Sequence, residues 1–309
     1  MNVKASNDSV MSAQDVGNGA HAVVLLHGLC GSALELGSVQ KALQNNGCTV
    51  VALEVPGYSA SLTVPGETPD WLAWCEFVEA EIARLKEQFE TVSICGLSMG
   101  ATLALAVAAR GDHVSSMVLL SPVLYYDGWS VPWYHKLLGL AFRLGFRDWT
   151  YKECEPYGIK NLAMRRRVIN ALKKDGVAAV GAAEIPARQL WAALQLMAHV
   201  RELLPLVRTR AMVMHSVDDE TASPRGAELI LEKIASETRR AIWLGDCYHI
   251  ITVDNEREIV TNETVQFLKR DVDRAGNDRP RIEPLQRLAL KDRRSPRSAA
   301  FSVSRALNR

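Results

Sequence analysis

A serine between two glycines separates an apolar run from an Ala- and Leu-rich stretch, and this arrangement constrains the fold most strongly. Residues 92–97 have the composition of a short buried strand, and residues 99–109 have that of a helix. The pattern Gly-x-Ser-x-Gly, with Ser98 at its centre, stands at their junction. This strand–turn–helix order is the context of a nucleophile elbow, in which a sharp turn lifts the serine oxygen clear of the backbone. Small residues two positions either side of Ser98 let strand and helix approach closely.

Further apolar runs alternate with amphipathic stretches along the chain. Strands are expected over 22–26, 49–53, 116–120, 211–215 and 240–244, and helices over 36–45, 71–89, 225–236 and 255–268. Continuous apolar runs of this kind are typical of strands that are buried on both faces of a parallel sheet. Because strands alternate with helices, the sequence predicts an α/β fold with a doubly wound, mostly parallel sheet.

The alternation stops at about residue 124 and resumes after about residue 201. We recognise no strand in between, where aromatic residues accompany two amphipathic stretches, so a helical cap inserted into an α/β domain at 21–270 is expected. Residues 1–20 are expected to be a flexible lead-in. Residues 271–309 carry ten Arg and Lys against five Asp and Glu, and we expect a basic tail that is disordered or loosely helical.

Composition limits the partners and the compartment. The 309 residues are 48% hydrophobic and 23% charged, with a net charge of +1, so nothing points to nucleic acid as a partner. No run of about 18 apolar residues predicts a membrane span. The polar first residues lack the apolar core of a secretory signal. Six cysteines show no C-x-x-C pair and no metal-ligand spacing, and we expect a cytoplasmic protein in a reducing compartment.

A nucleophilic serine needs a base, an acid that orients the base, and donors for the oxyanion. The chain order expected on such a sheet is Ser, then Asp or Glu, then His. His249 lies in a short loop between the last predicted strand and the last predicted helix, where a base can reach back over the sheet edge. His215 ends a strand but precedes the acid loop, so we expect His249 to be the base.

The acid is expected after the penultimate strand, where residues 217–224 supply three carboxylates. We favour Asp219 over Asp218, and Glu220 lies one residue further into the turn. A different placement follows the strand after the elbow helix, where Asp127 stands. The carboxylates that do not serve as the acid are expected to be solvated loop charges.

Two backbone N–H groups are expected to form the oxyanion hole. One belongs to Met99, which follows the nucleophile, and the other to Leu29, in the loop after the first strand. That loop, residues 27–32, has the glycines needed to turn N–H groups toward the site. His27 is expected to be structural, with hydrogen bonds inside the loop, and Cys30 is expected to be structural because the elbow already uses His249.

Four motifs carry a resemblance to a known family: His27-Gly28-Leu29-x-Gly31, Gly96-Leu97-Ser98-Met99-Gly100, Asp219-Glu220-x-x-x-Pro224 and Tyr248-His249-x-x-Thr252-x-Asp254. Together they resemble the α/β-hydrolase superfamily, and within it bacterial carboxylesterases and monoacylglycerol lipases. The resemblance covers about 22–124 and 201–268. Two features depart from that subgroup. Pro56-Gly57-Tyr58 stands where Gly-His-Gly is usual, and the cap is longer than that of the small esterases.

The resemblance implies a serine hydrolase that cleaves esters of apolar acids, with monoacylglycerols among the candidate substrates. It implies that Ser98 attacks the ester, that His249 and Asp219 assist it, and that water then releases the acid from an acyl-enzyme. Neither a cofactor nor a metal is implied. A peptidase or acyltransferase with the same triad, and a non-catalytic binding protein on this fold, remain alternatives.

An apolar, aromatic and basic stretch at 132–147 lies in the predicted cap. We favour a cap helix whose apolar face packs onto the core domain. The alternative is a lid that touches lipid surfaces or lines an acyl pocket. The basic tail also leaves contact with anionic lipid open, although we favour a dispensable solvated extension.

Overall fold

A computed structural model describes residues 20–111, 114–133, 137–152, 154–175, 177–178, 181–182 and 184–277. The predicted lead-in, apart from Ala20, and the predicted tail beyond Asn277 lie outside the described residues. Within the described residues, no helix is both long and apolar enough to cross a lipid bilayer.

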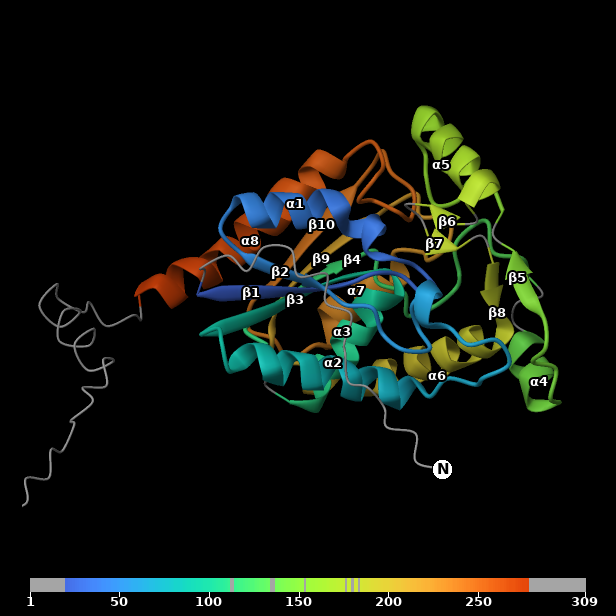
Figure 1. Cartoon of the computed structure of the whole chain (residues 1–309), viewed down its shortest axis with the longest axis horizontal. Helices are drawn as coiled ribbons and strands as arrows, with labels where there is room; N and C mark the ends of the chain where they lie inside the picture. The colour runs from blue at the N-terminus through green and yellow to red at the C-terminus, as the bar shows by residue number, and fades with distance from the viewer. Residues whose placement is uncertain are drawn as a thin grey trace, which may run out of the picture.

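Parallel strands form the centre of the molecule (Figure 1). In the part of the chain that the structure describes, six strands form one sheet in the order β10-β9-β4-β3-β1-β2. They are β1 (His21–Leu26), β2 (Thr49–Ala52), β3 (Thr91–Leu97), β4 (Ser116–Leu120), β9 (Arg210–Ser216) and β10 (Arg239–Leu244). Every pairing in this sheet is parallel. The predicted α/β fold with a doubly wound sheet is therefore confirmed, and the order of the strands reverses beside β3 and β1, where ligands bind in such sheets.

Helices cover both faces of the sheet (Figure 1). On one face lie α1 (Gly37–Asn45) and α8 (Arg257–Asn277). On the other lie α2 (Trp71–Lys86), α3 (Met99–Arg110), α6 (Ala187–Leu203) and α7 (Arg225–Lys233). Short 3-10 helices follow β1, β2 and α6, namely η1 (Ala33–Leu36), η2 (Ala60–Leu62) and η4 (Leu204–Leu206).

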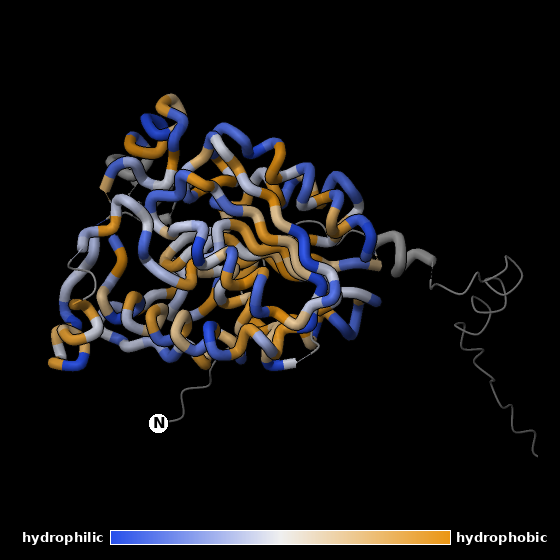
Figure 2. Tube along the Cα trace, turned by 180° about the vertical axis from the view of Figure 1, so that it is seen from behind, coloured by the Kyte–Doolittle hydropathy of each residue, from blue (hydrophilic) through white to orange (hydrophobic). Residues whose placement is uncertain are grey.

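The strand sequences explain the two helical layers. On β1, Val24 and Leu26 pack with α2 and α3, whereas Val23 and Leu25 pack with α1 and α8. Successive side chains of a strand point to opposite faces, so a strand with helices on both faces must be apolar throughout. Figure 2 shows the central strands as largely hydrophobic chain.

Between β4 and β9 the structure differs from the sequence-based prediction. No strand was expected there, but the structure has β5 (Thr150–Lys152) paired with β8 (Glu184–Pro186), and β6 (Val177–Ala178) paired with β7 (Gly181–Ala182). These strands are only two or three residues long, and all three residues of β5 are exposed, so they leave no apolar run in the sequence. The helices of this segment are α4 (Leu138–Arg143), α5 (Leu162–Asp175) and α6.

The three helices of this segment occupy different places. Figure 1 shows α4 and α5 beyond one end of the sheet, whereas α6 packs against α3 in the main core through Ala193, Leu196 and Met197. Part of the predicted cap thus covers the sheet, and the boundaries of the cap stay a prediction.

The apolar stretch in the predicted cap does not pack as expected. Phe142 of α4 is buried, but it contacts Ala187 and Leu190 at the start of α6. Leu137, Leu140, Leu144 and Phe146 on this stretch are exposed, and Figure 2 shows apolar chain at this corner of the molecule. The prediction that the apolar face of this stretch packs onto the core domain is therefore wrong for these exposed residues, whereas Phe142 and the partly buried Leu138 pack at the start of α6.

Candidate active site

The nucleophile-elbow geometry is present at Ser98. It follows β3 directly and adopts φ 56° and ψ −120°, a backbone conformation that residues other than glycine rarely adopt. A Cβ at position 96 would overlap the backbone of Gly100, and a Cβ at position 100 would overlap the carbonyl oxygen of Leu26. Both positions therefore require glycine, because strand and helix meet here too closely for any side chain.

The structure brings three of the predicted site residues into one hydrogen-bonded chain. His249 Nε2 lies 2.8 Å from Ser98 Oγ, and His249 Nδ1 lies 2.7 Å from Asp219 Oδ2. Asp219 is on the loop after β9 and His249 on the loop after β10, so both reach the carboxyl edge of the sheet. Both residues are buried, at 3% and 5% exposure.

Asp219 is held in its ionised form. Burial alone would raise its pKa, but the charge and the hydrogen bond of His249, together with a hydrogen bond from the Ala222 N–H, outweigh burial and leave the pKa below its usual range. The second carboxylate oxygen accepts hydrogen bonds from the N–H groups of Thr221 and Ala222, at 2.9 and 2.8 Å. The carboxylate is thus fixed in direction as well as in charge.

The other carboxylates considered as the acid make different contacts. Asp218 is exposed and binds Lys160 Nζ at 2.9 Å. Asp127 accepts the Ser223 N–H at 2.9 Å, which fastens the acid loop to the chain after β4. Glu220 is buried rather than solvated, because its Oε2 accepts the backbone N–H of His249 at 3.0 Å.

His215 lies beneath the acid loop and not beside Ser98. Its Nε2 is 2.9 Å from the Ala222 carbonyl oxygen, so Nε2 carries the proton and donates it there. The same nitrogen is 3.4 Å from Asp219 Oδ2. Burial lowers the pKa of His215. A neutral His215 ring therefore packs beneath the loop of Asp219 and donates a hydrogen bond to its backbone.

The two predicted oxyanion donors are the backbone N–H groups of Met99 and Leu29. Met99 is the first residue of α3, where an N–H has no acceptor inside its own helix. Leu29 lies between Gly28, whose N–H donates to Glu35 at 2.7 Å, and Cys30, whose N–H donates to the Tyr58 carbonyl at 3.0 Å. Their assignment to the oxyanion hole stays a prediction.

His27 holds the oxyanion loop, residues 27–32, through a buried network. Because its Nδ1 lies 2.7 Å from the Gly28 carbonyl oxygen, Nδ1 must be the protonated nitrogen. Its Nε2 then accepts the hydroxyl of Ser59 at 2.7 Å. Burial lowers the pKa of His27, in keeping with a neutral ring. The Tyr58 hydroxyl, fully buried, donates to the His27 carbonyl oxygen at 2.6 Å. Tyr58, the last residue of the Pro56-Gly57-Tyr58 turn, thus stabilises the loop.

Glu35 is a buried neighbour of the site that the sequence analysis missed. Its Oε2 accepts the Gly28 N–H at 2.7 Å. Burial raises its pKa to about 7, although hydrogen bonds from the N–H groups of Gly28 and Ser32 oppose the rise. A signal was present, because Ser32-Ala-Leu-Glu35 has the spacing of a capping box, in which the glutamate turns back onto the first backbone N–H.

Thr252 and Asp254 were quoted in a motif but given no role. The Thr252 hydroxyl donates to the Glu35 carbonyl oxygen at 2.6 Å. The Asp254 carboxylate accepts four backbone N–H groups, those of Lys160, Asn161, Tyr248 and Asn255. The loop that bears His249 is therefore fastened on one side to η1 and on the other to the chain before α5.

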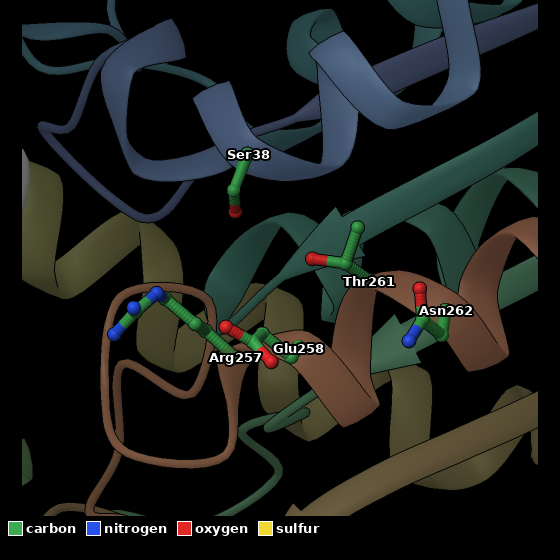
Figure 3. Close-up of a pocket in the computed structure, with 5 residues that line it drawn as sticks. All are labelled: Ser38, Arg257, Glu258, Thr261 and Asn262. Atoms are coloured by element: carbon green, nitrogen blue, oxygen red, sulfur yellow. The ribbon is translucent and has the colours of Figure 1, made fainter. Parts of the chain in front are cut away.

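A surface groove of about 320 Å³ lies between α1 and α8 (Figure 3). The groove is lined by Ser38, Arg257, Glu258, Thr261 and Asn262. It therefore includes none of the residues Ser98, Asp219 and His249. Among the described residues, no group of three or more His, Cys, Asp or Glu side chains is arranged to hold a metal ion.

Comparison with known proteins agrees with this geometry. The family described as serine aminopeptidase, S33 (Hydrolase_4) matches residues 17–257. A thermostable monoacylglycerol lipase of Bacillus sp. (strain H-257) is 22% identical over 263 residues, which cover 82% of this chain and 92% of that protein. A carboxylesterase of Bacillus subtilis (strain 168) is 23% identical over 265 residues, which cover 82% and 94%.

A solved structure shares the fold. The monoacylglycerol lipase of Paleococcus ferrophilus superposes with a TM-score of 0.67 at 19% identity, over 80% of this chain and 93% of that one. The family match spans most of the chain and includes the strands that bear Ser98, Asp219 and the loop of His249. The protein is therefore a member of the Hydrolase_4 family, described as serine aminopeptidase S33, and has the α/β-hydrolase fold.

Proposed function

We propose that this protein is a serine hydrolase that cleaves carboxylic esters of apolar acids through an acyl-enzyme on Ser98. The observation that carries the proposal is the hydrogen-bonded chain from Ser98 Oγ through the His249 ring to Asp219. A serine hydroxyl becomes a useful nucleophile only beside a base that is itself oriented by a third group. All three requirements meet here on a strained elbow.

Each residue has a definite task in this mechanism. His249 Nε2 accepts the proton of Ser98 as Oγ attacks the ester carbonyl carbon, while Asp219 accepts the Nδ1 proton and stabilises the imidazolium. The N–H groups of Leu29 and Met99 donate to the oxyanion. His249 then gives its proton to the departing alcohol, and water repeats the sequence to release the acid.

The substrate class rests on two observations. The relatives are named monoacylglycerol lipase and carboxylesterase. Around α4, exposed apolar side chains at Leu140, Leu144 and Phe146 offer a surface for an acyl chain. We infer that esters of apolar acids, monoacylglycerols included, are the substrates, and that α4 makes peripheral contact with lipid. Co-sedimentation with phospholipid vesicles, lost in Leu140→Gln/Leu144→Gln, tests the contact.

Peptide hydrolysis is the second candidate, because the family description names a serine aminopeptidase. An aminopeptidase must bind the free ammonium group of its substrate, and a buried ammonium needs a paired charge. Within the described residues, the buried carboxylates around Ser98 are already engaged: Glu35 by Gly28, and Glu220 by His249. This engagement favours an ester as the substrate.

Hydrolysis of p-nitrophenyl esters from acetate to palmitate, beside amino-acid p-nitroanilides, tests the proposal. We expect wild-type turnover to be highest for medium or long acyl chains and to be abolished in Ser98→Ala. Faster turnover of the anilides would identify a peptidase. Turnover of acetate alone would contradict an apolar acyl pocket, and no Ser98-dependent turnover of any ester would overturn the proposal.

We also propose a cytoplasmic location. Five of the six cysteines are buried, as expected of small apolar thiols that are kept in a reducing compartment. Fractionation of cells that express the tagged full chain tests this location.

A further inference from the structure

A buried glutamate, Glu35, supports the oxyanion loop from behind. We propose that Glu35 is a positioning residue, and that its carboxyl group holds the loop in the arrangement that presents the Leu29 N–H to the oxyanion. The inference rests on the proposed function, because it concerns the same reaction. It adds a carboxyl group to the site that is separate from the acid, Asp219.

The contacts place this carboxyl directly under the loop. Glu35 is only 2% exposed, and its Oε2 accepts the Gly28 N–H at 2.7 Å. A Cβ built on Gly28 would lie 3.0 Å from that oxygen and 3.7 Å from the Cβ of Ser98. Gly28 therefore contacts the carboxyl and lies close to the nucleophile, and the next N–H along the chain is that of Leu29.

The oxyanion loop also comes close to the Glu35 carboxyl at Gly31. A Cβ at Gly31 would overlap Oε1 of Glu35. The loop backbone thus approaches the carboxyl at Gly31 as well as at Gly28. The absence of a side chain at position 31 leaves the space that the carboxyl fills.

The backbone of Glu35 links the oxyanion loop to the loop of the base. Its carbonyl oxygen accepts the Thr252 hydroxyl at 2.6 Å, and the Thr252 carbonyl accepts the Ser38 hydroxyl at 3.0 Å. Thr252 lies three residues after His249. One residue therefore contacts both segments whose relative position decides whether the oxyanion donors and the base face the same carbonyl group.

A contribution to stability alone does not explain why the Glu35 carboxyl is buried. Burial raises the pKa of Glu35 to about 7, so its charged form is disfavoured in the folded protein. Ionisable groups buried against their own preference concentrate at functional sites. Hydrogen bonds from Gly28 and Ser32 offset part of the burial, and both donors belong to the oxyanion loop.

Two substitutions disturb this carboxyl in independent ways. Glu35→Gln keeps the size but replaces one acceptor oxygen by an NH2 group, which cannot accept from a backbone N–H. Gly31→Ala keeps the glutamate and displaces its carboxyl, since the overlap is with the end of a flexible side chain. Gly37→Ala, where a Cβ meets nothing within 4 Å, is the matched glycine control. Glu79→Gln, at an ion pair with Arg110 on the outside of α2, is the matched glutamate control.

The measurement compares the transition state with the ground state. For each variant we would measure kcat and KM on a p-nitrophenyl ester, and the inhibition constants of a trifluoromethyl ketone and of the alcohol with the same chain. The ketone forms an oxyanion on Ser98, whereas the alcohol does not. We expect Glu35→Gln and Gly31→Ala to lower kcat roughly tenfold or more and to weaken the ketone by the same factor. KM and alcohol binding should change less than about twofold, as in both controls.

Several outcomes would overturn the proposal. Unchanged kcat and ketone binding in either folded variant would do so, as would an equal loss of alcohol binding, which would indicate general damage to the site. If Glu35→Gln lacks a cooperative unfolding transition, Gly31→Ala decides, and loss of the fold in both would assign Glu35 to stability alone. A wild type without Ser98-dependent turnover would instead overturn the proposed function, and this inference with it.

Discussion

At the scale of single residues, two adjacent aspartates after β9 have opposite surroundings. The Asp219 side chain is fully buried against His249 and two backbone N–H groups. The Asp218 side chain is 51% exposed and pairs with Lys160. The two neighbouring carboxylates thus differ in burial and in the groups that they bind, and of the two only Asp219 contacts His249.

This contrast predicts the effects of two isosteric changes. Asp219→Asn removes the charge that stabilises the imidazolium and should lower kcat by roughly 10³- to 10⁴-fold. Asp218→Asn should leave kcat within about twofold, because an exposed ion pair contributes little. Steady-state kinetics on one ester would check both, and a larger loss in Asp218→Asn would mean that the acid has been misidentified.

Glu35 gives a prediction about stability and pH. Its pKa rises from 4.5 to about 7 on folding, so between these values the folded protein binds more protons than the unfolded chain. Stability from this group is therefore present at low pH and falls as the pH rises through the interval, by up to about 3 kcal/mol. Urea unfolding at pH 5 and pH 8 should show Glu35→Gln gaining stability relative to wild type at the higher pH. A difference between the two proteins that does not change with pH would contradict the burial of an ionisable group here.

At the scale of elements, the loop between β10 and α8 is organised by one carboxylate. Asp254 is fully buried and accepts backbone N–H groups from both sides, from Tyr248 next to the base and from Lys160 and Asn161 before α5. The loop of His249 and the segment before α5 are therefore a single unit. Opening of the predicted cap must leave this contact in place if His249 is to stay aligned.

Asp254→Asn is expected to weaken this unit. An amide offers one acceptor oxygen in place of two, so two of the four N–H groups face a donor, and each lost buried hydrogen bond costs about 1–3 kcal/mol. We expect a lower Tm and a roughly tenfold lower kcat. Asp246→Asn, on an exposed residue that pairs with Lys160, is the control. Equal Tm and kcat in the two variants would show that Asp254 does not organise the loop.

Elements buried on both faces were predictable from the sequence, and elements set by local contacts were not. The strands around Val24 and Ile94 show continuous apolar runs because helices cover both of their faces. The strand at Thr150–Lys152 is exposed and short, so nothing in its composition distinguishes it from a loop. Ser98 and His249 stand in motifs with a chemical meaning, whereas the role of Glu35 depends on a contact with Gly28 that only the fold creates.

At the scale of the whole molecule, the two ends of the parallel strands carry different groups of residues. The candidate active site lies where β3, β9 and β10 end. At the opposite edge, where strands begin, Asp271 of α8 binds Arg210 of β9 at 3.0 Å and accepts the hydroxyl of Ser116 on β4. This buried cluster fastens α8 across the sheet, far along the chain from the loop of His249.

Asp271→Ala should therefore separate stability from activity. It leaves the guanidinium of Arg210 buried without its carboxylate, which typically costs 3–5 kcal/mol. We expect a loss of about 3 kcal/mol in urea unfolding, with kcat at 25 °C within about twofold of wild type. Glu263→Ala, which breaks the more exposed pair with Arg240, should lose less than about 1 kcal/mol. A loss of kcat in the folded Asp271→Ala protein would contradict this prediction, because it would show that the Asp271 cluster also influences the candidate active site.

The identity of the nucleophile can be measured directly. The wild type, Ser98→Ala and His249→Ala would be treated with an alkyl fluorophosphonate, and the modified residue would be located by peptide mass spectrometry. We expect one adduct per chain, on Ser98, absent in Ser98→Ala and formed at least a hundredfold more slowly in His249→Ala, roughly the contribution of a general base. An adduct on another residue, or none in a wild type that hydrolyses esters, would contradict the assignment of Ser98 as the nucleophile.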